Sequence, residues 1–66
     1  MYNIILTLLN NEKKSLFVQN FEEAIIFEQD FRDTNYNSVL SVQLVNGGIF
    51  SIKKSAVASI EIKRSL

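Results

Sequence analysis

Carboxylates are the side chains of this chain that could do chemistry. The 66-residue sequence has no histidine and no cysteine, which are the usual general base near neutral pH and the source of most nucleophiles and transition-metal ligands. Acidic residues gather in one short stretch as Glu22, Glu23, Glu28, Asp30 and Asp33. Grouped carboxylates can act as general acid and base or bind Mg²⁺. Whether either chemistry is feasible depends on the secondary structure that carries these carboxylates.

The acidic stretch is predicted to lie on a helix. Asn20 is a good N-cap with Glu23 three positions later, the spacing of a capping box, and a helix is expected over residues 21–33. At about 100° per residue, Glu22, Asp30 and Asp33 share one face of this helix and Glu23 borders it. An open helix face lacks the cleft and the desolvation that a catalytic carboxylate needs. We therefore expect no enzyme, no metal site and no cofactor.

Ile26 projects from the middle of this acidic face. The opposite side of the helix carries Ala24, Phe27 and Phe31, which are expected to pack on a sheet. Single exposed apolar residues are common and often have no role. An apolar residue ringed by charges is also the usual layout of a protein-contact patch. The candidate partner-binding residues are Ile26, Glu22, Glu23, Asp30 and Asp33.

The remaining patterns are those of β-strands. Residues 2–9 and 15–18 predict a first hairpin, and residues 39–45 and 49–53 predict a second one around Asn46-Gly47, the dipeptide best suited to a type I′ turn. The last strand, 57–63, places Ala58, Ile60 and Ile62 on one side. The order ββαβββ predicts a single α+β domain over residues 1–66, in two layers, with an antiparallel sheet of about five strands and one helix packed on one face.

Several of these strands are apolar on both faces. Ile5 and Leu9 in the first strand, and Val39 and Val45 in the third, lie opposite the expected core face. One helix cannot cover both faces of five strands. Either the sheet curls into a partial barrel and covers itself, or a second copy covers it. We expect a homo-oligomer, most simply a dimer, because so small a domain without disulfide or zinc has a thin core.

Basic residues near the strand ends offer an alternative function. Lys53, Lys54, Lys63 and Arg64 could bind nucleic acid, with Tyr36 or Phe50 stacking on bases. The net charge of zero and the pI near 6.1 are far from the basic footprint of such proteins. A third function is a small-molecule pocket for a nucleotide-like ligand at an oligomer interface, lined by Tyr2, Tyr36 or Phe50.

The N-terminal run, residues 2–9, is apolar but has no basic start and is too short to span a bilayer. We therefore expect a cytoplasmic protein that does not enter a membrane.

The chain resembles small accessory proteins of phages and prophages from low-GC Gram-positive bacteria. The resemblance lies in an Asn-, Lys- and Ile-rich composition, in the capped acidic helix and in the terminal strand Ser59-Ile60-Glu61-Ile62-Lys63. The resemblance carries over no functional residue. It implies a non-enzymatic interaction protein that binds a protein partner stoichiometrically and inhibits or redirects a host or defence protein.

Overall fold

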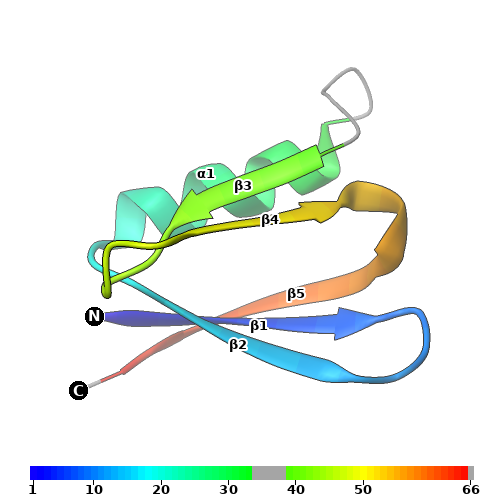
Figure 1. Ribbon diagram of the computed structural model, residues 1–66, viewed down its shortest axis with the longest axis horizontal. Helices are drawn as coiled ribbons and strands as arrows, with labels where there is room; N and C mark the ends of the chain where they lie inside the picture. Colours follow the sequence, from blue (N-terminus) through cyan, green and yellow to red (C-terminus); the bar gives the residue numbers. More distant parts are fainter. Residues whose placement is uncertain (34–38, 66) are drawn as a thin grey trace.

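A computed structural model describes residues 1–33 and 39–65 of the chain. The elements, in chain order, are strands β1 (Tyr2–Leu8) and β2 (Lys13–Val18), helix α1 (Phe21–Arg32), strands β3 (Val39–Gln43) and β4 (Ile49–Lys53), the short 3₁₀ helix η1 (Lys54–Ala56) and strand β5 (Val57–Arg64) (Figure 1). This confirms the α+β class and the order ββαβββ. Helix α1 ends at Arg32, one residue before the predicted limit.

The five strands form two antiparallel sheets instead of one. The first sheet has the order β2-β1-β5 and the second contains β3 and β4. Figure 1 shows the β3–β4 hairpin and α1 on one side of the molecule and the first sheet on the other. The sheets meet where the backbone N–H of Val45 donates to the carbonyl oxygen of Phe17 at 2.9 Å. Helix α1 connects β2 to β3 and packs against β1, β2 and β3.

The hydrophobic core lies between the two sheets and the helix. Its buried members are Ile4 and Leu6 of β1, Leu16 and Val18 of β2, Ala24 and Phe27 of α1, Leu40 and Val42 of β3, and Val57 of β5. Each sheet therefore covers the inner face of the other, as in the partial-barrel alternative. The outward-facing apolar residues of the prediction remain at the surface: Leu9 and Val39 are exposed and Ile5 is half-buried.

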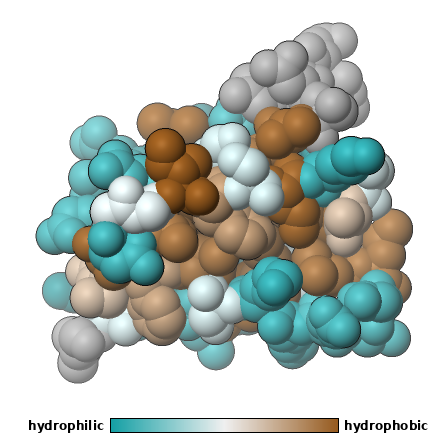
Figure 2. Space-filling model, viewed as in Figure 1, coloured by the Kyte–Doolittle hydropathy of each residue, from teal (hydrophilic) through white to brown (hydrophobic). Residues whose placement is uncertain are grey.

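The seam between the sheets is incompletely closed. In the view of Figure 1, hydrophobic side chains gather in the middle of the molecule, between the β3–β4 hairpin and the first sheet (Figure 2). Partly buried hydrophobic residues packed against the core come from both strands that border the seam: Phe50 and Ile52 of β4, and Ile60 and Ile62 of β5. The core of this small domain is thin where β4 and β5 diverge.

The β3–β4 loop differs from the predicted type I′ turn. Gly47 has φ of 90°, as predicted, but Asn46 does not have the positive φ that a type I′ turn also requires. The N–H of Leu44 donates to Gly48 O at 2.8 Å and the N–H of Gly47 donates to Leu44 O at 3.0 Å. This is a three-residue loop, in which a turn is followed by one left-handed residue. The Asn46 side chain closes it by accepting from the N–H of Gly48 at 2.8 Å.

The β1–β2 loop repeats this arrangement. The N–H of Leu8 donates to Glu12 O at 2.8 Å and the N–H of Asn11 donates to Leu8 O at 2.9 Å. Asn11 takes the left-handed position with φ of 71°, and Asn10 Oδ1 accepts from the N–H of Glu12 at 3.0 Å. The two hairpins thus use the same loop geometry, with asparagine in place of glycine in the first.

A β-bulge changes the predicted faces of β5. Thr7 lies opposite Ser59 but Leu8 lies opposite Val57, so Ala58 is an extra residue in the ladder. Because a bulge interrupts the alternation of side chains, Val57 is buried and Ala58 is exposed. The prediction that Ala58 shares the inner side with Ile60 and Ile62 is therefore wrong for Ala58 alone.

Candidate functional site

The start of α1 is fixed by a side-chain cap. Asn20 is in an extended conformation and its Oδ1 accepts from the N–H of Glu23 at 3.0 Å, which satisfies one of the free donors of the first turn. The apolar side of the helix sets which residues face the core. Phe27 is 1% exposed and Ala24 is fully buried, whereas Ile26 is 56% exposed. This confirms that Ile26 lies outside the core, while Phe31, also predicted to pack inward, contacts the core and stays half-buried.

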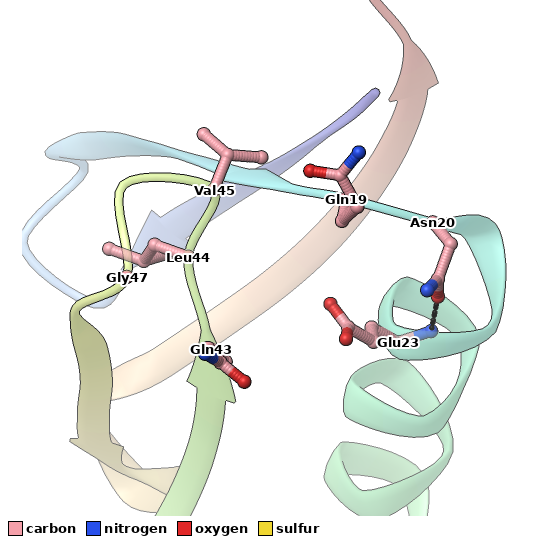
Figure 3. A pocket seen from close by; sticks show the side chains of 7 residues that line it. All are labelled: Gln19, Asn20, Glu23, Gln43, Leu44, Val45 and Gly47. Atoms are coloured by element: carbon pink, nitrogen blue, oxygen red, sulfur yellow. Dashed lines mark hydrogen bonds between the residues drawn. The ribbon is translucent and has the colours of Figure 1, made fainter.

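Ile26 opens onto a groove between α1 and β3. A pocket of about 200 Å³ is lined by Glu23, Ile26, Phe27, Ser41, Val42 and Gln43. A second pocket of about 280 Å³ is lined by Gln19, Asn20, Glu23, Gln43, Leu44, Val45 and Gly47 (Figure 3). The two pockets share Glu23 and Gln43. We call these two adjoining pockets together the α1–β3 groove.

The two ends of the α1–β3 groove differ in chemistry. One end presents the apolar atoms of Ile26, Phe27 and Val42. At the other end, Figure 3 shows Glu23 reaching from α1 and Gln43 from β3 toward the space between the two elements. Amides and a carboxylate can hydrogen-bond to polypeptide backbone or to a basic side chain, and the apolar end can hold an aliphatic side chain. The described residues contain no group of three metal-ligating side chains.

The structure gathers only part of the predicted acidic rim around Ile26. Glu23 lines the groove, and Asp30, four residues after Ile26, is half-buried. Glu22 and Asp33 are exposed on the solvent side of the helix, and the backbone carbonyl of Asp33 accepts from Lys54 Nζ. The rim is therefore acidic along the helix and uncharged along β3, where Ser41 and Gln43 border the groove.

Glu28 and Arg32 form the exposed i,i+4 pair of α1. Their Oε2 and Nη2 atoms lie 3.4 Å apart and the Arg32 side chain is largely in solvent. Such surface pairs contribute only about 0–1 kcal/mol. This pair stabilises the helix, and neither residue lines the α1–β3 groove.

The four basic residues of the nucleic-acid alternative do not form one patch. Lys53 ends β4 and Lys54 begins η1, whereas Lys63 and Arg64 lie near the end of β5. That strand has eight residues and spans roughly 25 Å at about 3.3 Å per residue. Lys63 Nζ is also 3.9 Å from Glu61 Oε2 on the same strand. The two pairs of cations are therefore held at opposite ends of β5.

The aromatic residues named for stacking or pocket lining are not grouped. Tyr36 lies outside the described residues. Phe50 is half-buried against the core, and the ring of Tyr2 packs on that of Phe21 with centroids 5.2 Å apart. Tyr2 and Phe50 line neither pocket of the α1–β3 groove.

The β3 side of the groove was missed by sequence reasoning. Ser41 and Gln43 alternate with inward-facing Leu40 and Val42, so their exposure could be anticipated. No local pattern shows that this strand lies beside α1, because periodicity marks the buried side of an element and not the element that covers it.

Comparisons of the chain with protein-family models, with curated proteins and with solved structures find no match. Within residues 1–33 and 39–65, no helix is long and apolar enough to cross a membrane. The functional argument therefore rests on the geometry of the α1–β3 groove and on the sequence.

Proposed function

We propose that this protein is a non-enzymatic interaction protein that binds a protein partner stoichiometrically through the α1–β3 groove. Ile26 is the apolar anchor and Glu23 and Asp30 supply the acidic rim. Glu22 and Asp33 add negative charge on the solvent side of the helix. The observation that carries the proposal is the 56% exposure of Ile26 in a groove that it lines together with Glu23, Phe27 and Val42.

The groove offers both affinity and selectivity. Burying the exposed part of an isoleucine stabilises a complex by roughly 1 kcal/mol, about half the value for a fully exposed side chain. Residues 21–33, which comprise α1 and its C-cap Asp33, carry a net charge of −4. Charges around an apolar anchor mainly steer encounter and reject wrong partners, so the expected partner surface combines an aliphatic side chain with lysine or arginine.

The resemblance to phage and prophage accessory proteins supports a host or defence protein as the partner. It also supports the cytoplasm as the place of action, and inhibition or redirection of that protein as the result. Binding alone is sufficient for such a role, since occupying a surface of the target blocks its other contacts.

A pair of matched variants tests the groove. Immobilised protein is used to capture partners from a lysate of a low-GC Gram-positive host, with quantitative mass spectrometry as the readout. Ile26→Lys places a charge in the groove, whereas Ile49→Lys makes the same change at a residue of β4 that is 75% exposed and outside the groove. We expect Ile26→Lys to lose a captured protein that wild type and Ile49→Lys retain.

The stability of both variants is measured alongside capture. Substitutions of exposed residues usually change stability by less than about 0.5 kcal/mol, so both variants are expected to unfold at nearly the wild-type denaturant concentration. Equal capture by Ile26→Lys and wild type would remove Ile26 as the anchor. Unfolding by Ile26→Lys would contradict the assignment of the helix faces.

Self-association is the second part of the proposed function, with a homodimer as the simplest form. It is supported by the two short sheets, which end in β2 and β5 and in β3 and β4, since an unpaired strand edge is a template for pairing with another chain. The closed inner faces of the sheets do not require a second copy, so the contact is expected at an edge.

A further inference from the structure

Among residues 1–33 and 39–65, strand β5 presents an open edge with a defined set of backbone groups. It pairs with β1 on one side and ends the first sheet on the other. The N–H of Ser65 donates to Met1 O at 3.0 Å, and hydrogen bonding alternates from residue to residue along an antiparallel pair. The backbone groups of Ser59, Glu61 and Lys63 therefore turn toward β1. Those of Ile60, Ile62 and Arg64 turn toward the open edge.

The side chains along this edge alternate in chemistry. Glu61 and Lys63 lie on the outer face of the sheet, opposite Ile5 and Asn3 of β1, and their side chains are 62% and 61% exposed. Their own contact, 3.9 Å between Lys63 Nζ and Glu61 Oε2, is near the upper limit for an ion pair. Ile60 and Ile62 face inward and are half-buried at the seam. The edge thus has an acid and a base on one face and two aliphatic residues on the other.

We propose that a second copy of this chain pairs with β5 in antiparallel fashion about a two-fold axis at Ile62. This inference rests on the proposed self-association and names its surface. Glu61 then lies opposite Lys63 of the partner subunit, and Lys63 opposite the partner's Glu61. Ile62 lies opposite its symmetry copy, and the aliphatic stem of Arg64 lies along Ile60 of the partner subunit. The two three-stranded sheets become one continuous six-stranded sheet.

The charge pattern selects this register over its neighbours. An axis at Glu61 or at Lys63 would place like charges opposite each other, which destabilises a cross-strand pair, whereas opposite charges stabilise it. An axis at Ile60 would place Glu61 opposite Ser59, with no charge partner. The axis at Ile62 also turns the free backbone groups of Ile60, Ile62 and Arg64 toward the partner strand. The bulge at Ala58 ends the usable edge on the far side.

The other strands that end a sheet, β2, β3 and β4, lack this complementarity. Strand β2 has only the basic residues Lys13 and Lys14, β4 has only Lys53, and β3 has no charged residue. Two antiparallel copies of any of these strands would therefore form no ion pair. The observations therefore favour β5 as the self-pairing edge.

Charge-reversal variants test the register. Dimerisation is measured by sedimentation equilibrium for wild type, Glu61→Lys, Lys63→Glu and the double variant that exchanges the two residues. By symmetry, each single reversal converts both cross-strand ion pairs into like-charge pairs, and we expect the dimer dissociation constant to rise by about tenfold or more. The double variant restores both pairs and is expected to return the constant to near the wild-type value. Lys13→Glu, the same charge change at an exposed residue of β2, is the control and leaves dimerisation unchanged.

A proline variant tests the backbone pairing. Arg64→Pro removes an N–H that points to the open edge, a position at which a strand tolerates proline. We expect it to weaken the dimer and to leave the urea midpoint of the monomer near its wild-type value. Lys63→Pro, which removes an N–H turned toward β1, is expected to destabilise the monomer itself.

The outcomes distinguish self-association in general from pairing through β5 in particular. A wild-type mass of 7.6 kDa at every concentration would overturn both self-association and the β5 pairing. A dimer that ignores the charge reversals would overturn the β5 pairing and leave self-association standing. Masses above that of a dimer would overturn the two-fold contact, because a non-symmetric contact forms rings or open chains. None of these results bears on the capture experiment with Ile26→Lys.

Discussion

Gly47→Val isolates the energetic requirement of the β3–β4 loop. Gly47 has φ of 90°, and a Cβ atom added there would meet no atom within 4 Å, so the cost of the substitution is a backbone cost. The left-handed conformation costs an L-residue about 1–2 kcal/mol, and a β-branched side chain is an outlier there. Replacing glycine also restricts the unfolded chain, which offsets about 0.4–1 kcal/mol. The expected net loss is about 1 kcal/mol or more.

Urea denaturation followed by circular dichroism measures this loss. With a slope of about 1 kcal/mol per molar urea for a small domain, the midpoint falls by roughly 1 M. Asn11→Val is the matched variant, because Asn11 occupies the equivalent position of the β1–β2 loop with φ of 71°, and it is expected to lose a similar amount. An unchanged midpoint for Gly47→Val would refute the left-handed loop geometry. A large loss at Gly47 with none at Asn11 would refute the equivalence of the two loops.

Two further stability predictions concern the helix. Phe27→Ala removes a side chain that is 1% exposed and is expected to cost about 3–5 kcal/mol, a large share of the roughly 3–10 kcal/mol that stabilises a domain of this size. Phe31→Ala removes a half-buried ring and is expected to cost clearly less; equal midpoints for the two variants in urea would contradict the observed burial. Asn20→Ala removes the acceptor for the N–H of Glu23 and is expected to cost about 1 kcal/mol, measured as a lower melting temperature. Asn20→Asp retains an acceptor and is the control, so an equal loss of stability in the two variants would argue against the cap.

Local sequence rules predicted most of the elements. The Asn20 cap, the start of α1 and the inward side of Ala24 and Phe27 follow from short-range hydrogen bonding and from the helical period. Gly47 at positive φ follows from its missing Cβ. These features depend on residues within a few positions of each other, so a sequence without comparison to relatives is sufficient to place them.

The finer loop and ladder geometry was predicted less well. Asn46-Gly47 favours a type I′ turn, yet the loop has three residues and only Gly47 is left-handed. The alternation in residues 57–63 concealed the bulge at Ala58. The loop length and the bulge were both missed for the same reason. Each depends on which residues pair across the ladder, and this register is set by the partner strand and not by the side chains of one strand alone.

Residue types and local patterns were sufficient to predict the α+β class, the order of the elements, the lack of histidine and cysteine and the exposure of Ile26. Three features came to light only in the folded chain: the two sheets that cover each other, the placement of β3 beside α1 at Ile26, and the position of β5 at the end of a sheet. Hydrophobic periodicity marks which side of an element is buried but does not name the element that buries it. That choice depends on contacts between elements, such as those of α1 with β1, β2 and β3, which the periodicity of one element does not encode.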